Sequence, residues 1–162
     1  MDDLLAEAAI RDVQIRYCRA VDRMDFDLLR SCFHADATTD YGFFAGDVDG
    51  FIEMARNGLV RYRWTTHFTG NQLVEVNGDA AWAEHYAVAT HLCPADAKGS
   101  DREYICRIRY VDRMERRDDD WRIAKRVLVV DSARTDPIPE AGSGRPSSSG
   151  KRDQSDPSYL LR

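Results

Sequence analysis

Long apolar runs, a basic excess and patterned cysteines are all missing from this 162-residue sequence. No segment approaches the roughly 20 consecutive apolar residues that a helix needs to cross a bilayer. The formal net charge of −5 argues against a nucleic-acid partner, because binding phosphates requires a clustered excess of lysine and arginine. The chain begins Met-Asp-Asp-Leu-Leu, without the charged and apolar regions of a signal peptide. These absences predict a cytoplasmic protein that binds neither a membrane nor nucleic acid.

Metal and cofactor motifs are absent as well. The four cysteines lack the spacing of a zinc site. His85 and His91 fall six residues apart on one expected strand, which separates them by about 20 Å, too far to share an ion. Neither a glycine-rich phosphate loop nor a strand–Ser–helix nucleophile elbow occurs. We therefore expect no metal and no cofactor.

The spacing of apolar residues changes once along the chain, from helical to strand-like. Apolar residues recur every three or four positions over 10–24, which predicts an amphipathic helix. Asp25 is placed to be the N-cap of a short second helix, and a third helix is expected over 48–62. Helices followed by consecutive antiparallel strands indicate an α+β fold. The expected strands, in which the apolar period is two, are 65–76, 80–92, 102–115 and 121–131, with a hairpin turn at Asn77-Gly78.

The composition divides the chain into one domain, residues 1–136, and a tail, residues 137–162, that is rich in proline, glycine and serine. Such a composition is typical of disorder. The alternative is that the tail packs on a partner subunit through Tyr159, Leu160 and Leu161. Apolar residues are expected on both faces of the strands, which predicts a homodimer or a homotrimer.

Four polar residues in apolar surroundings are candidates for chemistry. Asp22 falls near the C-terminal end of the first helix, where the helix dipole disfavours a carboxylate, so a compensating group such as a histidine is needed. A carboxylate bound to one ring nitrogen of His67 would leave the other nitrogen to accept a proton. Arg126, on an apolar strand face, requires a carboxylate such as Asp22 or Glu84, or an anionic ligand. The structural alternatives are a loop cap for Asp22, a hydrogen-bonded core histidine for His67, an exposed strand charge for Arg126 and core packing for Tyr17.

Several stretches of the chain resemble the SnoaL-like branch of the nuclear transport factor 2-like superfamily. Within this family the sequence is similar to scytalone dehydratase, hexachlorocyclohexane dehydrochlorinase and bile acid 7α-dehydratase. The resemblance implies a cone-shaped α+β barrel, in which a curved antiparallel sheet wraps around about three N-terminal helices and encloses one apolar pocket. The stretches that carry it are 9–22, 25–29, 33–37, 66–71 and 121–126.

The resemblance also implies roles for individual residues. Asp22 matches the family aspartate late in the first helix, and His67 matches the histidine base. Arg126 matches the arginine that the dehydrochlorinase and the bile acid enzyme carry on the last strand. Tyr17 matches a tyrosine of the bile acid dehydratase, whereas the dehydrochlorinase has a lysine there, which disfavours chloride elimination in this chain. The second histidine of scytalone dehydratase has no secure counterpart; His85 and His91 are candidates for it, and the role is carried over to neither.

Together these features predict a cofactor-independent, dehydratase-type lyase. Its substrate would be a small hydrophobic cyclic molecule, such as a steroid, a polyketide or an aromatic intermediate. Asp22 and His67 would form a general-base dyad, while Tyr17 and Arg126 would stabilise the departing oxygen or the developing enolate. The alternatives are an isomerase or cyclase on the same scaffold, or a non-catalytic ligand-binding or structural subunit like a ring-hydroxylating dioxygenase β subunit. The residues expected to line the substrate pocket are Tyr41, Phe43, Met54, Trp64, Asn71 and Tyr86.

Overall fold

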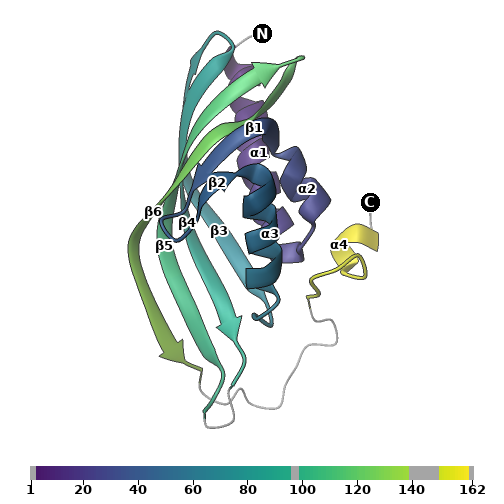
Figure 1. Cartoon of the computed structure of the whole chain (residues 1–162), viewed down its shortest axis with the longest axis vertical. Helices are drawn as coiled ribbons and strands as arrows, with labels where there is room; N and C mark the ends of the chain where they lie inside the picture. The colour runs from purple at the N-terminus through teal and green to yellow at the C-terminus, as the bar shows by residue number, and fades with distance from the viewer. Residues whose placement is uncertain (1–2, 96–98, 139–149, 161–162) are drawn as a thin grey trace.

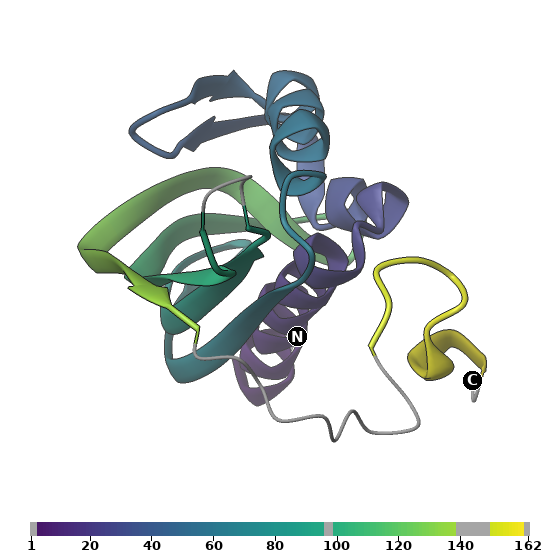
Figure 2. The ribbon, with the colours of Figure 1, turned by 90° about the horizontal axis from the view of Figure 1, so that it is seen from below.

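A curved, open sheet of six strands lies against a layer of helices (Figure 1) in a computed structural model that describes residues 3–95, 99–138 and 150–160. Viewed from below, the sheet curls part of the way around, and the helices lie together on its open side (Figure 2). The helices are α1 (Asp3–Arg23), α2 (Phe26–Ser31), α3 (Val48–Leu59) and α4 (Pro157–Leu160). The strands are β1 (Phe33–Asp40), β2 (Ala45–Asp47), β3 (Thr65–Asn77), β4 (Ala80–Cys93), β5 (Arg102–Arg117) and β6 (Asp120–Pro137).

The α+β architecture predicted from the sequence is confirmed, and one strand pair differs from the antiparallel expectation. The strand order is β2-β1-β6-β5-β4-β3, and β1 runs parallel to β6. Every other described pair is antiparallel. Parallel neighbours need a long connection, and here α3 and the β3–β5 meander separate β1 from β6 in the chain. The sheet is therefore mixed.

Side-chain caps fix where two of the helices begin. The Asp25 carboxylate accepts a hydrogen bond from the Leu28 backbone N–H at 3.1 Å, so the predicted N-cap of α2 is confirmed. Asp47 caps α3 in the same way, through the Gly50 N–H at 2.9 Å. Residue 59 ends α3, three residues before the end that the apolar spacing predicts.

The inner face of the sheet carries a row of alanines on β4. Ala81, Ala83, Ala87 and Ala89 are all buried, and each lies on the face that the helices cover. Side chains this small allow the helical layer to approach the sheet, and they leave space where that layer ends. The alternate residues of β4, among them Trp82, point to the outer face and are partly exposed.

A bulge in β3 changes which of its residues face inward. The pairing with β4 shifts register between Thr69 and Gln72. Strict alternation would put Phe68 and Val74 on the same face, but the extra residue places them on opposite faces. Phe68 is therefore 73% exposed, whereas Val74 packs on the core.

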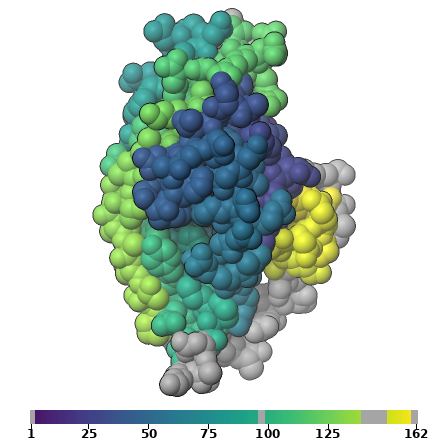
Figure 3. Space-filling model, viewed as in Figure 1, coloured from purple at the N-terminus to yellow at the C-terminus, as the bar shows by residue number. Residues whose placement is uncertain are grey.

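β6 ends at Pro137, six residues beyond the end at 131 that the apolar spacing predicts. In Figure 3 the described C-terminal segment, residues 150–160, is seated at the side of the helical layer. It contacts its own chain, since the Tyr159 hydroxyl donates to the Asp25 carboxylate at 2.9 Å. The side chain of Leu160 and all of Leu161, which one of the two alternatives for the tail places against a partner subunit, lie outside the described part. No described helix combines the length and the apolar character that a bilayer span requires.

Candidate active site

Asp22 and His67 touch where α1 ends and β3 begins. Oδ1 of Asp22 lies 2.7 Å from Nδ1 of His67, and Oδ2 accepts a hydrogen bond from the His67 backbone N–H at 2.9 Å. The Thr65 hydroxyl donates to Oδ1 at 2.9 Å. These donors offset the unfavourable position of a carboxylate at the C-terminal end of a helix. The sequence predicts the histidine partner but not Thr65 or the backbone N–H.

The position of β3 in the sheet explains why the backbone N–H of His67 is available. β3 forms one edge of the sheet, so the N–H groups on its open side have no neighbouring strand. Asp22 binds one of these groups and the ring of the same residue, which fixes both the backbone and the imidazole of His67. With Nδ1 donating to the carboxylate, Nε2 is left as the proton acceptor. Within the described residues Nε2 has no hydrogen-bond partner.

A cavity of about 250 Å³ opens beside this histidine. Its walls come from α1, α3, the β1–β2 segment and the inner faces of β3 to β6. The lining is predominantly apolar and aromatic. Side chains that contribute to it include Tyr17, Phe51, Tyr62, His67, His91 and Tyr110.

Buried phenol groups form one wall of this cavity. The hydroxyls of Tyr17 and Tyr41 lie 2.7 Å apart, and the rings of Tyr17 and Tyr110 meet edge to face at 5.3 Å. Burial raises the pKa of all three tyrosines well above its ordinary value, although the nearby Arg126 charge partly opposes this rise. The hydroxyls therefore stay protonated and are available as hydrogen-bond donors.

Arg126 lies behind these rings and does not line the cavity. It is fully buried, and its Nε and Nη2 atoms donate to the Asp112 carboxylate at 2.7 and 2.6 Å. The guanidinium carbon is 4.0 Å from the ring centre of Tyr17 and 4.4 Å from that of Tyr110. The expected partner, Asp22 or Glu84, is thus corrected to Asp112. The two residues face each other directly across β5 and β6.

The predicted pocket residues divide into two groups. Tyr41, Phe43 and Met54 line the cavity. The expectation that the other three do so is corrected. Tyr86 is on the outer face of β4 and 41% exposed, because strand residues alternate between faces. Asn71 is exposed within the β3 bulge, and Trp64 lines a separate groove beside the C-terminal segment.

His91, one of the two candidates for the second histidine, lines the cavity. Its ring lies 5.7 Å from the His67 ring and 4.8 Å from that of Tyr62. Burial, followed by the neighbouring His67, lowers the pKa of His91 to about 4. At neutral pH the ring beside His67 is therefore uncharged and does not compete with it for Asp22.

A family model for the SnoaL-like domain matches residues 2–127. No curated protein sequence matches the chain. Among solved structures, the type 2 hexachlorocyclohexane dehydrochlorinase LinA is 22% identical, with a TM-score of 0.76 over 91% of this chain and 98% of that chain. A scytalone dehydratase-like protein from Novosphingobium aromaticivorans DSM 12444 is 20% identical, with a TM-score of 0.73 over 86% and 97%.

A third similar structure is that of Rv3472, a Mycobacterium tuberculosis protein of unknown function. It is 27% identical, with a TM-score of 0.68 over 80% of this chain and 74% of that chain. At 22% and 20% identity, the similarity of the dehydrochlorinase and the dehydratase-like protein to this chain is one of fold. Proteins with this fold include enzymes that eliminate a leaving group.

Proposed function

Since this chain belongs to the SnoaL-like domain family, we propose that it is a cofactor-independent lyase that eliminates water from a small, hydrophobic, cyclic substrate. The observation that carries the proposal is the 2.7 Å contact between Asp22 and His67 at the wall of an apolar cavity. A structural subunit has no need of a carboxylate-oriented imidazole at the wall of a cavity. The contact therefore favours an enzyme over the structural alternative.

In the proposed reaction His67 is the general base. Its Nε2 takes a proton from a carbon next to an activating carbonyl, and Asp22 stabilises the imidazolium that forms. The electron pair of the broken C–H bond becomes the new C=C bond while the C–O bond to the leaving hydroxyl breaks. The departing hydroxyl takes up the proton that His67 removed, so that water leaves and the neutral imidazole is restored. An isomerase or cyclase would share the first step and differ in what the carbanion does next.

The tyrosine wall supports the second half of the reaction. Tyr17 and Tyr41 keep their protons and line the cavity, so their hydroxyls can donate to a departing oxygen or an enolate. Arg126 does not reach the cavity and is proposed to act through the rings it contacts, by holding Tyr17 in place with a cation–π interaction. In this proposal its role is to position a donor rather than to bind the substrate.

The size of the cavity narrows the substrate class. A cavity of about 150 Å³ in another protein holds one benzene molecule. The cavity here, at about 250 Å³, is larger by about 100 Å³, which leaves room for a second ring fused to the first. A substrate with one or two rings, such as an aromatic intermediate or a small polyketide, fits this space better than a four-ring steroid.

The proposal is tested with a panel of one- and two-ring β-hydroxy carbonyl compounds. Mass spectrometry of each incubation is expected to show loss of water from at least one of them. His67→Ala should lower that turnover by about 10² to 10⁴-fold, which is the contribution of a placed general base. Unchanged turnover in this variant would remove His67 as the base and the proposal with it.

We also propose that the chain is a cytoplasmic homodimer or homotrimer. Support comes from the outer face of the sheet, where Phe68, Tyr86 and Val88 are 73%, 41% and 38% exposed. Sedimentation at micromolar concentration is expected to show an oligomer, and a monomer there would contradict this assignment.

A further inference from the structure

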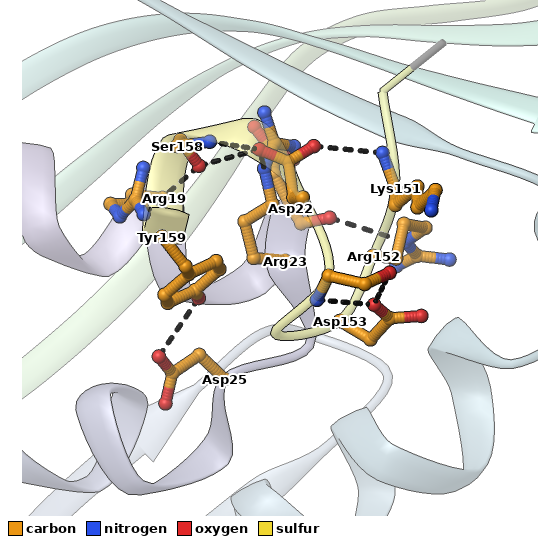
Figure 4. Close-up of polar contacts among 11 residues, drawn as sticks. Arg19, Asp22, Arg23, Asp25, Lys151, Arg152, Asp153, Ser158 and Tyr159 are labelled. Carbon is orange, nitrogen blue, oxygen red and sulfur yellow. Dashed lines mark hydrogen bonds and ion pairs between the residues drawn. The ribbon is translucent and has the colours of Figure 1, made fainter. Parts of the chain in front are cut away.

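Arg152 reaches from the C-terminal segment to the backbone that holds Asp22. Its Nε donates to the carbonyl oxygen of Asp22 at 3.2 Å (Figure 4). Its Nη1 donates to the carbonyl oxygens of Leu59 and Tyr62, both at 2.9 Å. Nη2 lies 3.5 Å from the Thr65 hydroxyl, the same hydroxyl that donates to Asp22. One side chain therefore connects α1, the end of α3 and the start of β3.

The segment that delivers Arg152 is anchored independently of it. The buried Asp156 carboxylate accepts hydrogen bonds from the Lys151 and Ser158 backbone N–H groups at 2.8 and 3.0 Å. Arg19 of α1 lies over the Tyr159 ring at 4.8 Å and donates to the Ser158 hydroxyl at 3.2 Å. Since Tyr159 also binds Asp25, the segment is fixed on α1 and α2. The position of Arg152 relative to these helices is therefore fixed as well.

We propose that Arg152 is a positioning residue for the Asp22–His67 pair, so that the C-terminal segment is part of the active site; this inference rests on the proposed function. The planar guanidinium matches several acceptors at fixed angles, which a flexible ammonium group cannot do. Its charge also lies where α1 and α3 end, the position that helix dipoles favour for a cation.

The functional consequence follows from the short contacts at the dyad. Asp22 must keep both oxygens within hydrogen-bond distance of His67, and these bonds depend on how the end of α1 lies against β3. Displacements of about 1 Å in an active site can cost about 10²-fold in rate. Without Arg152 the three carbonyl oxygens lose their common donor, and the end of α1 is free to shift relative to β3.

The test compares Arg152→Ala with Lys151→Ala in the full-length chain. Both variants remove one positive charge from neighbouring positions, but the Lys151 side chain is exposed and makes no contact with Asp22 or His67. For Arg152→Ala we expect kcat on the substrate found above to fall by about 10 to 100-fold, with KM changed far less. Lys151→Ala should stay within about twofold of the wild type. Arg152→Lys should fall between the two, because it keeps the charge and loses the planar geometry.

A second readout does not depend on activity. The His67 backbone N–H donates to Asp22, so its hydrogen exchange, followed by NMR, reports whether the carboxylate is in place. In Arg152→Ala this exchange should accelerate by about tenfold, as expected for the loss of about one hydrogen bond, while amides of β5 keep their rates. Unchanged exchange and kcat would overturn the proposal. Uniform acceleration across the whole sheet would overturn it as well, since Arg152 would then be only a stabilising anchor.

The two proposals fail differently. If His67→Ala retains full activity while Arg152→Ala still accelerates exchange at His67, the lyase assignment is wrong and the link between Arg152 and Asp22 stands. If His67→Ala abolishes turnover and Arg152→Ala changes neither readout, the lyase stands and the positioning role is wrong.

Discussion

Asp112→Ala is expected to lower the free energy of unfolding by about 3 to 5 kcal/mol, the largest loss of stability that we predict for a single side chain. Arg126 and Asp112 are both buried and bonded to each other through two hydrogen bonds. Removing the carboxylate leaves the guanidinium charge in an apolar core with no counter-charge. Native domains are stable by only about 5 to 15 kcal/mol, so this loss should be plain in urea denaturation.

Asp131→Ala is the matched control for this experiment. Asp131 binds Arg109 through a similar pair of short contacts, but its side chain is 44% exposed. Exposed ion pairs contribute little to stability because water screens the two charges, so this variant should stay close to the wild type. A double substitution, Asp112→Leu with Arg126→Met, should recover most of the loss because it removes both charges together. Equal stability of the two single variants would contradict the assigned role of the buried pair.

Asp22→Asn is expected to reduce turnover by about 10² to 10⁴-fold while leaving the fold intact. The shape of the side chain is unchanged, and its amide oxygen can still accept the His67 backbone N–H. Its NH₂ group, however, would donate to Nδ1 of His67. The ring would then carry its proton on Nε2, the atom that must accept a proton from the substrate. The base would be present but in the wrong tautomer.

Two measurements check this result. Steady-state kinetics gives the loss in kcat, and a thermal melt within a few degrees of the wild type shows that folding is retained. Asp27→Asn serves as the control, because it makes the same chemical change five residues away, at an exposed position of α2. Wild-type turnover in Asp22→Asn would rule out the tautomer mechanism.

The helices and strands could be predicted from the sequence because their apolar periods are local properties. The N-cap at Asp25 and the change of period at Thr65 each depend on residues close in the chain. The bulge in β3 could not be predicted in this way. The residues between Thr69 and Gln72 are of the same types whether or not one of them is left unpaired, so the local sequence does not reveal the shift. That single residue sends Phe68 outward against the expected pattern.

The candidate site was only partly accessible to the same reasoning. Asp22 and His67 stand out because each is polar within an apolar pattern. Asp112 gives a similar signal, since it lies two positions from each of the buried residues Tyr110 and Met114 and so on the same face of β5. Its position opposite Arg126 follows once the strand register is known. Arg152 gave none, because it belongs to a segment with the composition of a disordered tail, and its contact with Asp22 spans 130 positions.

The alanines of β4 are positions at which substitution would change the size of the substrate that the cavity holds. Ala89 pairs with His67 in the strand register and lines the cavity, so the room beside the imidazole exists because β4 has only a methyl group there. A valine or leucine at this position would shrink the space without touching the acid, the base or the phenols. Selectivity for larger or smaller rings can therefore diverge among related chains while the chemistry stays constant.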